Sequence, residues 1–247
     1  QRIDYTCGEG LNEYNTTFAI FGFRYAEVEG DVELDPAAVE AVAVYSDLER
    51  TGDFACSHQL LNQLYEAPLR SAQGNHLDIP TDCPPRERHG WTGDAQLFFT
   101  TAAYLFDFAP FAKKYLHDVF DWQRKNGRLP HIVPEGGADF YMWTMNGSVG
   151  WSDVGVLIPW RYADIYRDDA ILREFYDGMA KYARFMESRC GKNMPFFAEH
   201  VKLSPEAKRY FVNQGQSYGE WAEPADVGGG FRWQDFVAPH PEVSTAY

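Results

Sequence analysis

The most informative run of the chain reads Asp82-Cys-Pro-Pro-Arg86-Glu87-Arg88-His-Gly-Trp91-Thr-Gly-Asp94. It ends a segment that starts at Asp78, in which prolines and glycines stiffen the backbone and four acids, two arginines and one histidine gather. Charged side chains on a rigid loop ahead of an apolar helix are typical of a binding or catalytic site. The spacing alone leaves two alternatives open: a surface ion-pair cluster, and a plain helix cap at Asp94.

Apolar residues recur at helical spacing on both sides of this run. We predict helices over 95–107, 109–125, 151–167 and 169–189, and a weaker one over 204–213. Residues 57–65 predict a further helix, with Ser57 as its N-cap and Pro68 kinking or ending it. The segment 126–149 is expected to be a long functional loop. Helix, long loop, helix and short turn in repetition favour a toroid of helix hairpins.

The N-terminal part has a different pattern. Aromatic and β-branched residues dominate 17–29, with partial alternation from Phe23 onward, and valines recur over 39–45. We therefore predict two β-strands here. Because two or three strands do not form an independently stable sheet, this part is expected to be the end of a β domain.

Composition limits the classes of function. The 247 residues carry a formal net charge of −14, which argues against nucleic acid or an anionic membrane surface as the main partner. An acidic chain with 7 Trp and 15 Tyr suits a neutral polar ligand such as a sugar. No apolar run approaches the roughly 20 residues that span a bilayer. The histidines and cysteines lack metal-ligand spacing, so we predict no metal, and we predict no cofactor.

The run from Asp82 to Asp94 closely resembles the signature of glycoside hydrolase family 78, the α-L-rhamnosidases. The segments that extend the resemblance include Phe21-Gly-Phe-Arg-Tyr25, Gly150-Trp151-Ser152-Asp153 and Tyr218-Gly219-Glu220-Trp221. The resemblance implies a mainly α fold: part of an (α/α)6 barrel preceded by a few strands of an N-terminal β-sandwich. The expected boundaries are 1–46 for the end of the sandwich with its linker, and 47–247 for an apparently truncated catalytic domain.

The resemblance also implies inverting hydrolysis of terminal α-L-rhamnose from an oligosaccharide, polysaccharide or glycoside. It places Glu87 at the general acid position. The residues expected to bind the sugar are Asp82, Arg86, Trp91, Asp94, Tyr141, Trp143, Trp151 and Asp153. The family's general base is expected in a Trp-Glu-Arg-Trp-like run, and the chain contains no such run.

Other expectations follow if the chain forms only about half of the barrel. The fragment alone is expected to be inactive or weakly active, and its exposed apolar helix faces carry a risk of self-association. Secretion or a periplasmic location would suit an enzyme that degrades glycans, but the sequence shows no targeting segment. Two alternatives stay open, namely another (α/α)6 glycosidase and a non-catalytic carbohydrate-binding fragment.

Overall fold

The structure is a computed structural model that describes residues 2–30, 35–137, 147, 149–192, 204–210 and 212. It is mainly helical, as predicted. The helices are η1 (Pro36–Ala38), α1 (Gln59–Asn75), α2 (Thr92–Leu105), α3 (Ala109–Asp121), α5 (Val154–Tyr166), α6 (Ala170–Arg189) and α7 (Pro205–Lys208). None of the described helices combines the length and the apolar character needed to cross a membrane.

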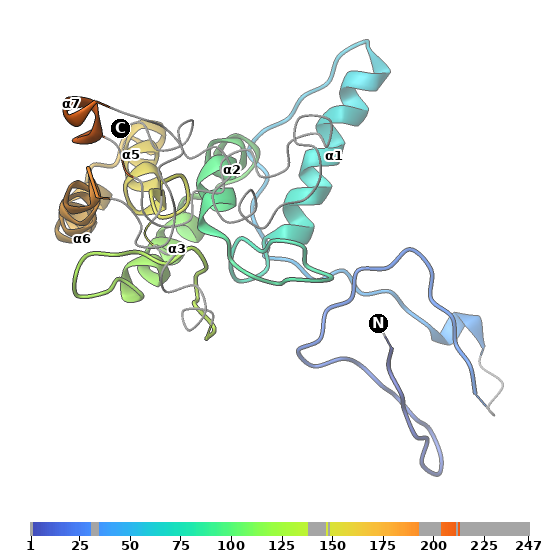
Figure 1. Cartoon of the computed structure of the whole chain (residues 1–247). Coiled ribbons are helices and arrows are strands. Elements are labelled where there is room, and N and C mark those ends of the chain that lie inside the picture. The colour runs from blue at the N-terminus through green and yellow to red at the C-terminus, as the bar shows by residue number, and fades with distance from the viewer. Residues whose placement is uncertain are drawn as a thin grey trace.

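The core forms where α5 packs against α2, α3 and α6 (Figure 1). This core contains two kinds of helix. The sequence of α2 is apolar nearly all round, with Asp94 as its one charged residue. In contrast, α3 and α6 are amphipathic and bury one stripe each, for example Leu116 and Val119 on α3 and Tyr182 on α6. A helix that is apolar all round carries more apolar surface than one contact can cover, and α2 and α5 leave Leu97, Tyr104 and Trp160 exposed.

Helix α1 stands beside this body, and the N-terminal chain extends away from it (Figure 1). The C-terminal half of α1 is anchored by a small second core, in which Leu69 and Ala72 pack with Leu105 and Phe106. The motif segment connects this end of α1 to the start of α2. Its position between two anchored helices fixes where the site lies.

The two predicted strands do not form in the described part of the N-terminal chain. Residues 2–30 and 35–58 contain only η1 and a single bridge residue, Arg50. The side chains that suggested strands are largely solvent-exposed, with Phe18 at 95% and Tyr25 at 81%. A strand needs a neighbouring strand for its backbone hydrogen bonds, and these residues find none here. The boundary at residue 46 stays a prediction.

Two local predictions about α1 are wrong, namely an N-cap at Ser57 and an end of the helix at Pro68, while a kink at Pro68 stays a prediction. The helix begins after His58, which makes no side-chain cap, and not after Ser57. It also continues through Pro68 to Asn75. Proline removes one hydrogen bond to the carbonyl four residues earlier, that of Leu64. Leu64 is exposed, so water can satisfy that carbonyl and the helix tolerates the interruption. The weak C-terminal helix forms only as α7, where the Ser204 hydroxyl accepts a hydrogen bond from the Ala207 N–H.

Candidate active site

The motif segment is a closed loop between α1 and α2. Asp82 and His89 pair as an antiparallel bridge, and the Asp82 N–H donates to the His89 carbonyl at 2.8 Å. Cys83 and Arg88 take positive φ angles of 42° and 58°, which turn the chain back on itself. These are uncommon angles for residues with a side chain, and they often mark functional sites. The closure brings Asp82, Glu87 and Trp91 to one end of the loop.

A second segment clamps the end of the motif. The Val133 N–H donates to the Gly90 carbonyl and the Thr92 N–H to the His131 carbonyl, both at 2.8 Å. Gly90 has to be glycine, because a Cβ there would overlap the carbonyl of Val133. Backbone pairing at this point fixes the position of Trp91 and the start of α2.

Glu87 accepts two hydrogen bonds through its carboxylate. Oε2 accepts from the indole Nε1 of Trp91 at 2.9 Å, and Oε1 accepts from Nη2 of Arg86 at 2.8 Å. The two donors differ in exposure, because the Arg86 side chain is 75% exposed while Trp91 is half-buried. The indole is held by the clamped backbone, whereas an exposed guanidinium can leave at little cost. Trp91 therefore orients Glu87, and Arg86 is the exchangeable partner.

Asp94 has a different environment from Glu87. It lies in the first turn of α2, and the N-cap position is occupied by Trp91. Solvent reaches Asp94, yet partial burial and the nearby charge of Glu87 raise the pKa of its carboxyl, opposed by a hydrogen bond from its own backbone N–H. No arginine contributes to this environment. It is therefore the carboxyl of the motif that is screened from the arginines.

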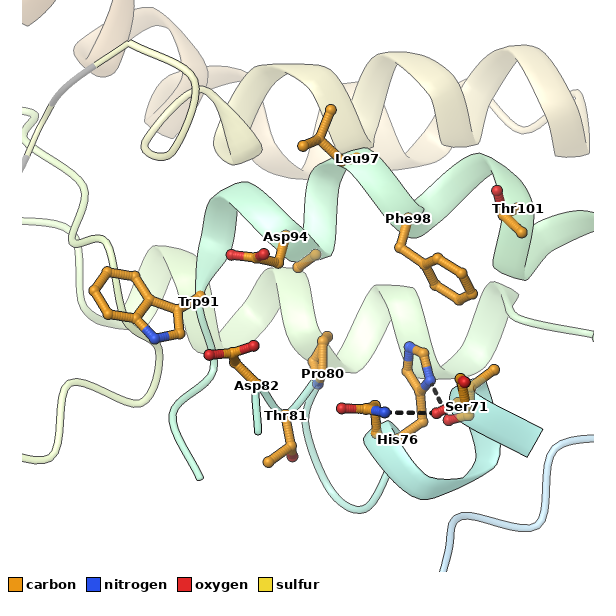
Figure 2. A pocket seen from close by; sticks show the side chains of 13 residues that line it. Ser71, His76, Pro80, Thr81, Asp82, Trp91, Asp94, Leu97, Phe98 and Thr101 are labelled. Carbon is orange, nitrogen blue, oxygen red and sulfur yellow. Dashed lines mark hydrogen bonds between the residues drawn. The ribbon is translucent and has the colours of Figure 1, made fainter. Parts of the chain in front are cut away.

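A pocket of about 420 Å³ opens between α1 and α2 (Figure 2). Asp82, Trp91 and Asp94 form one end of it, and His76, Phe98 and Thr101 lie toward the other (Figure 2). The volume lies within the range of small-molecule sites, and an apolar wall with a few acids at one end suits a deoxy sugar. Three of the predicted binding residues thus line one pocket, and Glu87 and Arg86 connect to it through Trp91.

Trp151 reaches the site from the start of α5. Its indole lies flat against Gly93, so that a Cβ at Gly93 would come within 2.6 Å of the ring. Asp153 is buried, and its carboxylate accepts from the Tyr182 hydroxyl at 2.8 Å and from the Gly150 N–H at 2.7 Å. In this structure Asp153 holds the turn that carries Trp151, and its role as a sugar-binding residue stays a prediction. Tyr141 and Trp143 lie outside the described residues.

One group of side chains meets the spacing of a metal site. Ligand atoms of Asp82, Cys83 and Glu87 lie within 4.8 Å of one another. The Arg86 guanidinium already contacts this group, through the Cys83 thiol at 3.4 Å and through Glu87. A cation in that place would face the positive charge of Arg86, so the donor set suits arginine better than a metal ion.

Sequence reasoning missed three residues around the site: His76, Gln96 and Tyr182. His76 is buried, and its Nδ1 lies 2.7 Å from the Ala72 carbonyl; burial lowers its pKa, opposed by that contact, and so favours the neutral ring. A neutral histidine presents Nε2 as an acceptor when Nδ1 holds the proton. His76 stands just before the motif and Gln96 just after it, but nothing in their spacing indicates which way they face.

Comparison with known proteins places this geometry among glycosidases. Residues 49–238 match the family model of the bacterial alpha-L-rhamnosidase 6 hairpin glycosidase domain. An α-L-rhamnosidase of Formosa agariphila is 34% identical over 255 residues, which is 100% of this chain and 24% of that protein. The family domain consists of six hairpins, which confirms the helical barrel that the sequence analysis predicts.

Solved structures of α-L-rhamnosidases are also similar to this chain. The crystal structure of Streptomyces avermitilis α-L-rhamnosidase complexed with L-rhamnose is 34% identical, with a TM-score of 0.55 over 59% of this chain and 14% of that chain. The α-L-rhamnosidase of Aspergillus terreus is 38% identical, with a TM-score of 0.54 over 62% of this chain and 17% of that chain. The chain spans only 17–24% of the length of the curated relatives it matches.

Proposed function

The chain belongs to the bacterial α-L-rhamnosidase six-hairpin glycosidase family, and on that premise we propose that the protein hydrolyses terminal, non-reducing α-L-rhamnosides. The substrates are rhamnose-containing glycosides, oligosaccharides or polysaccharides. One observation carries the proposal: Glu87 is held by Trp91, and Trp91 lines a pocket together with the carboxyls of Asp82 and Asp94. This is a sugar-sized site with a separately oriented acid beside it.

Glu87 is proposed as the general acid. To act, it must carry a proton on the oxygen that faces the leaving group. A protonated Glu87 can keep the Trp91 bond on Oε2 and hold its proton on Oε1 once Arg86 withdraws. Arg86 is the exposed partner, and the hydroxyls of a bound rhamnose offer it new acceptors. Binding of the sugar would thus free Glu87 for proton transfer to the glycosidic oxygen.

Asp82 and Asp94 are proposed to hold the rhamnose ring. The Asp82 carboxyl accepts hydrogen bonds from sugar hydroxyls, and Asp94, with its raised pKa, is suited to exchange a proton with a hydroxyl as charge develops on the ring. The indoles of Trp91 and Trp151 offer apolar faces to the ring and its methyl group. These roles are assigned by position at the pocket end and beside Gly93.

The mechanism is proposed to invert the anomeric configuration. Inversion needs a second carboxylate on the opposite face, roughly 6.5–9.5 Å from the acid, that activates water. We place that base outside these 247 residues, because the expected Trp-Glu-Arg-Trp-like run does not occur in them. The first-formed product would then be β-L-rhamnose, which proton NMR identifies before mutarotation.

The leaving group tests the role of Glu87. In the protein that carries this chain, Glu87→Gln should lower kcat on an alkyl α-L-rhamnoside by a factor on the order of 10²–10⁴. The loss should be far smaller on a nitrophenyl rhamnoside, whose leaving group needs little protonation. Asp94→Asn should impair both substrates alike. Glu66→Gln removes an arginine-paired carboxylate on α1 and is the matched control.

Equal losses on both substrates would contradict the assignment of Glu87. A panel of aryl glycosides separates the alternatives to the proposal. Turnover of another sugar in preference to rhamnose would favour a different six-hairpin glycosidase. Rhamnose binding without any turnover would favour a non-catalytic carbohydrate-binding protein.

A further inference from the structure

The side chain of Gln96 links α2, α5 and the turn that carries Trp151. It is 5% exposed, and its Oε1 accepts a hydrogen bond from Nη1 of Arg161 at 2.9 Å. Its Nε2 donates to the carbonyl of Gly150 at 3.3 Å. Because a guanidinium only donates, Arg161 forces Oε1 of Gln96 toward itself. The amide nitrogen is thereby directed at Gly150, so the orientation of Gln96 follows from its partners.

The other polar group of Gly150 is held as well. Its N–H donates to Oδ2 of Asp153, whose Oδ1 accepts from the buried hydroxyl of Tyr182. Gly150 has a φ of 86°, a conformation that glycine adopts without strain. Side chains from α2, from the start of α5 and from α6 therefore fix both backbone groups of one residue.

The next residue is Trp151, and this explains what the fixed turn does. Its indole packs flat on Gly93, the residue that precedes Asp94 in the chain, and Asp94 lines the pocket. An aromatic wall contributes most to sugar binding when it is already ordered, because a loose ring must lose its freedom on binding. A fixed Gly150 removes that cost for Trp151.

We propose that Gln96, oriented by Arg161, is a positioning residue that holds the Gly150–Trp151 turn so that the Trp151 indole is a rigid wall of the sugar site. The inference rests on the proposed function in one respect, that Trp151 faces the sugar. The positioning itself rests only on the contacts of Gln96, Gly150 and Gly93.

The test compares Gln96 with Gln123, a partly buried glutamine that makes the same type of contact. Gln123 donates through Nε2 to the carbonyls of Gly127 and Gly178, at 3.0 and 2.9 Å, on the α3–α6 side. Gln96→Leu and Gln123→Leu are made in the protein that carries this chain, labelled with fluorotryptophan. The Trp151→Phe variant assigns the fluorine resonance of Trp151. We expect Gln96→Leu to shift and broaden that resonance and Gln123→Leu to leave it unchanged.

A second variant separates positioning from folding. Gln96→Glu keeps an acceptor for Arg161 and loses the donor to Gly150, so it carries the test where Gln96→Leu does not fold. With a nitrophenyl rhamnoside, KM should rise roughly two- to tenfold in Gln96→Glu, the worth of one hydrogen bond, while kcat falls less. Gln123→Leu should lower the melting temperature without changing KM.

The two hypotheses fail in different ways. An unchanged Trp151 resonance in the Gln96 variants overturns the positioning role, whatever the activity. A shifted resonance with an unchanged KM in an active enzyme also overturns it, because the wall would then not matter to the sugar. A wild-type protein that hydrolyses no rhamnoside refutes the proposed function, and the resonance still decides whether Gln96 positions Trp151.

Discussion

Gly93→Ala offers a sharp test of the site, because glycine at this position is what lets Trp151 lie against α2. An added Cβ would lie 2.6–2.7 Å from three atoms of the indole. Ordinary carbon contacts are about 3.5–4.0 Å, so the ring has to retreat by about 1 Å. Overpacking of this kind costs roughly 1–3 kcal/mol, and the better helix propensity of alanine returns up to about 1 kcal/mol. We expect a net loss of up to about 3 kcal/mol in the free energy of unfolding.

The effect on function should exceed the effect on stability. A displacement of about 1 Å in a positioning group can cost on the order of 100-fold in rate. We therefore expect kcat/KM on a nitrophenyl rhamnoside to fall by one to two orders of magnitude. Stability is measured by urea unfolding and activity by steady-state kinetics of the protein that carries this chain.

Gly178→Ala is the matched control. Gly178 lies in α6, outside the motif segment. A Cβ there would lie 2.5 and 2.6 Å from two ring atoms of Phe120. The two variants should lose similar stability, and only Gly93→Ala should lose activity. If both keep wild-type kcat/KM at similar stability losses, Trp151 is not a wall of the site and the reasoning fails.

Three further predictions concern stability. Gly74→Ala places a methyl group in open space near the end of α1, so unfolding should cost about 0.5–1 kcal/mol more, and a melting temperature below wild type would contradict this. Ser152 is fully buried, accepts from the Gly147 N–H and donates to the Leu129 carbonyl, so Ser152→Ala should cost about 1–3 kcal/mol in urea unfolding. The folded state raises the pKa of Asp94, so ionisation of this carboxyl disfavours folding. The loss of stability begins near the pKa of the unfolded chain and grows as pH rises toward the higher pKa of the folded protein. Asp94→Asn should thus be the more stable protein at neutral pH, and unfolding curves of the two proteins should converge as pH falls below the unfolded pKa; a gap that widens in acid would show the sign to be wrong.

Local periodicity was enough to locate the helices. The segments around Leu116 and Tyr182 show the apolar stripe of an amphipathic helix, and this pattern needs no knowledge of the partner. Helix ends were less predictable, because Pro68 lies inside α1 where its effect depends on the exposure of Leu64. The prediction of strands was wrong for a related reason. Alternation at Phe23 and Tyr25 indicates only that one face of an extended segment is apolar, whereas a strand forms only if a second strand pairs with it.

Within the site, the sequence by itself determined which residues gather in one loop. Glu87 and Trp91 are four positions apart, and Asp82 and Asp94 bound a short segment stiffened by prolines and glycines, so their proximity follows from covalent connection. The resemblance to a known signature then assigned their roles. What it could not determine is which carboxyl is screened from the arginines, because burial and the charge of Glu87 act on Asp94 only in the folded chain.

Only the tertiary structure decided what stands around that loop. Trp151 lies on Gly93, Gln96 bonds to Gly150, and Tyr182 from α6 bonds to Asp153. Each of these contacts joins residues far apart in sequence: the first two form where α2 packs on α5, and the third where α5 packs on α6. A linear pattern shows that such surfaces exist, but their register, which sets which side chains meet, is decided when the helices pack.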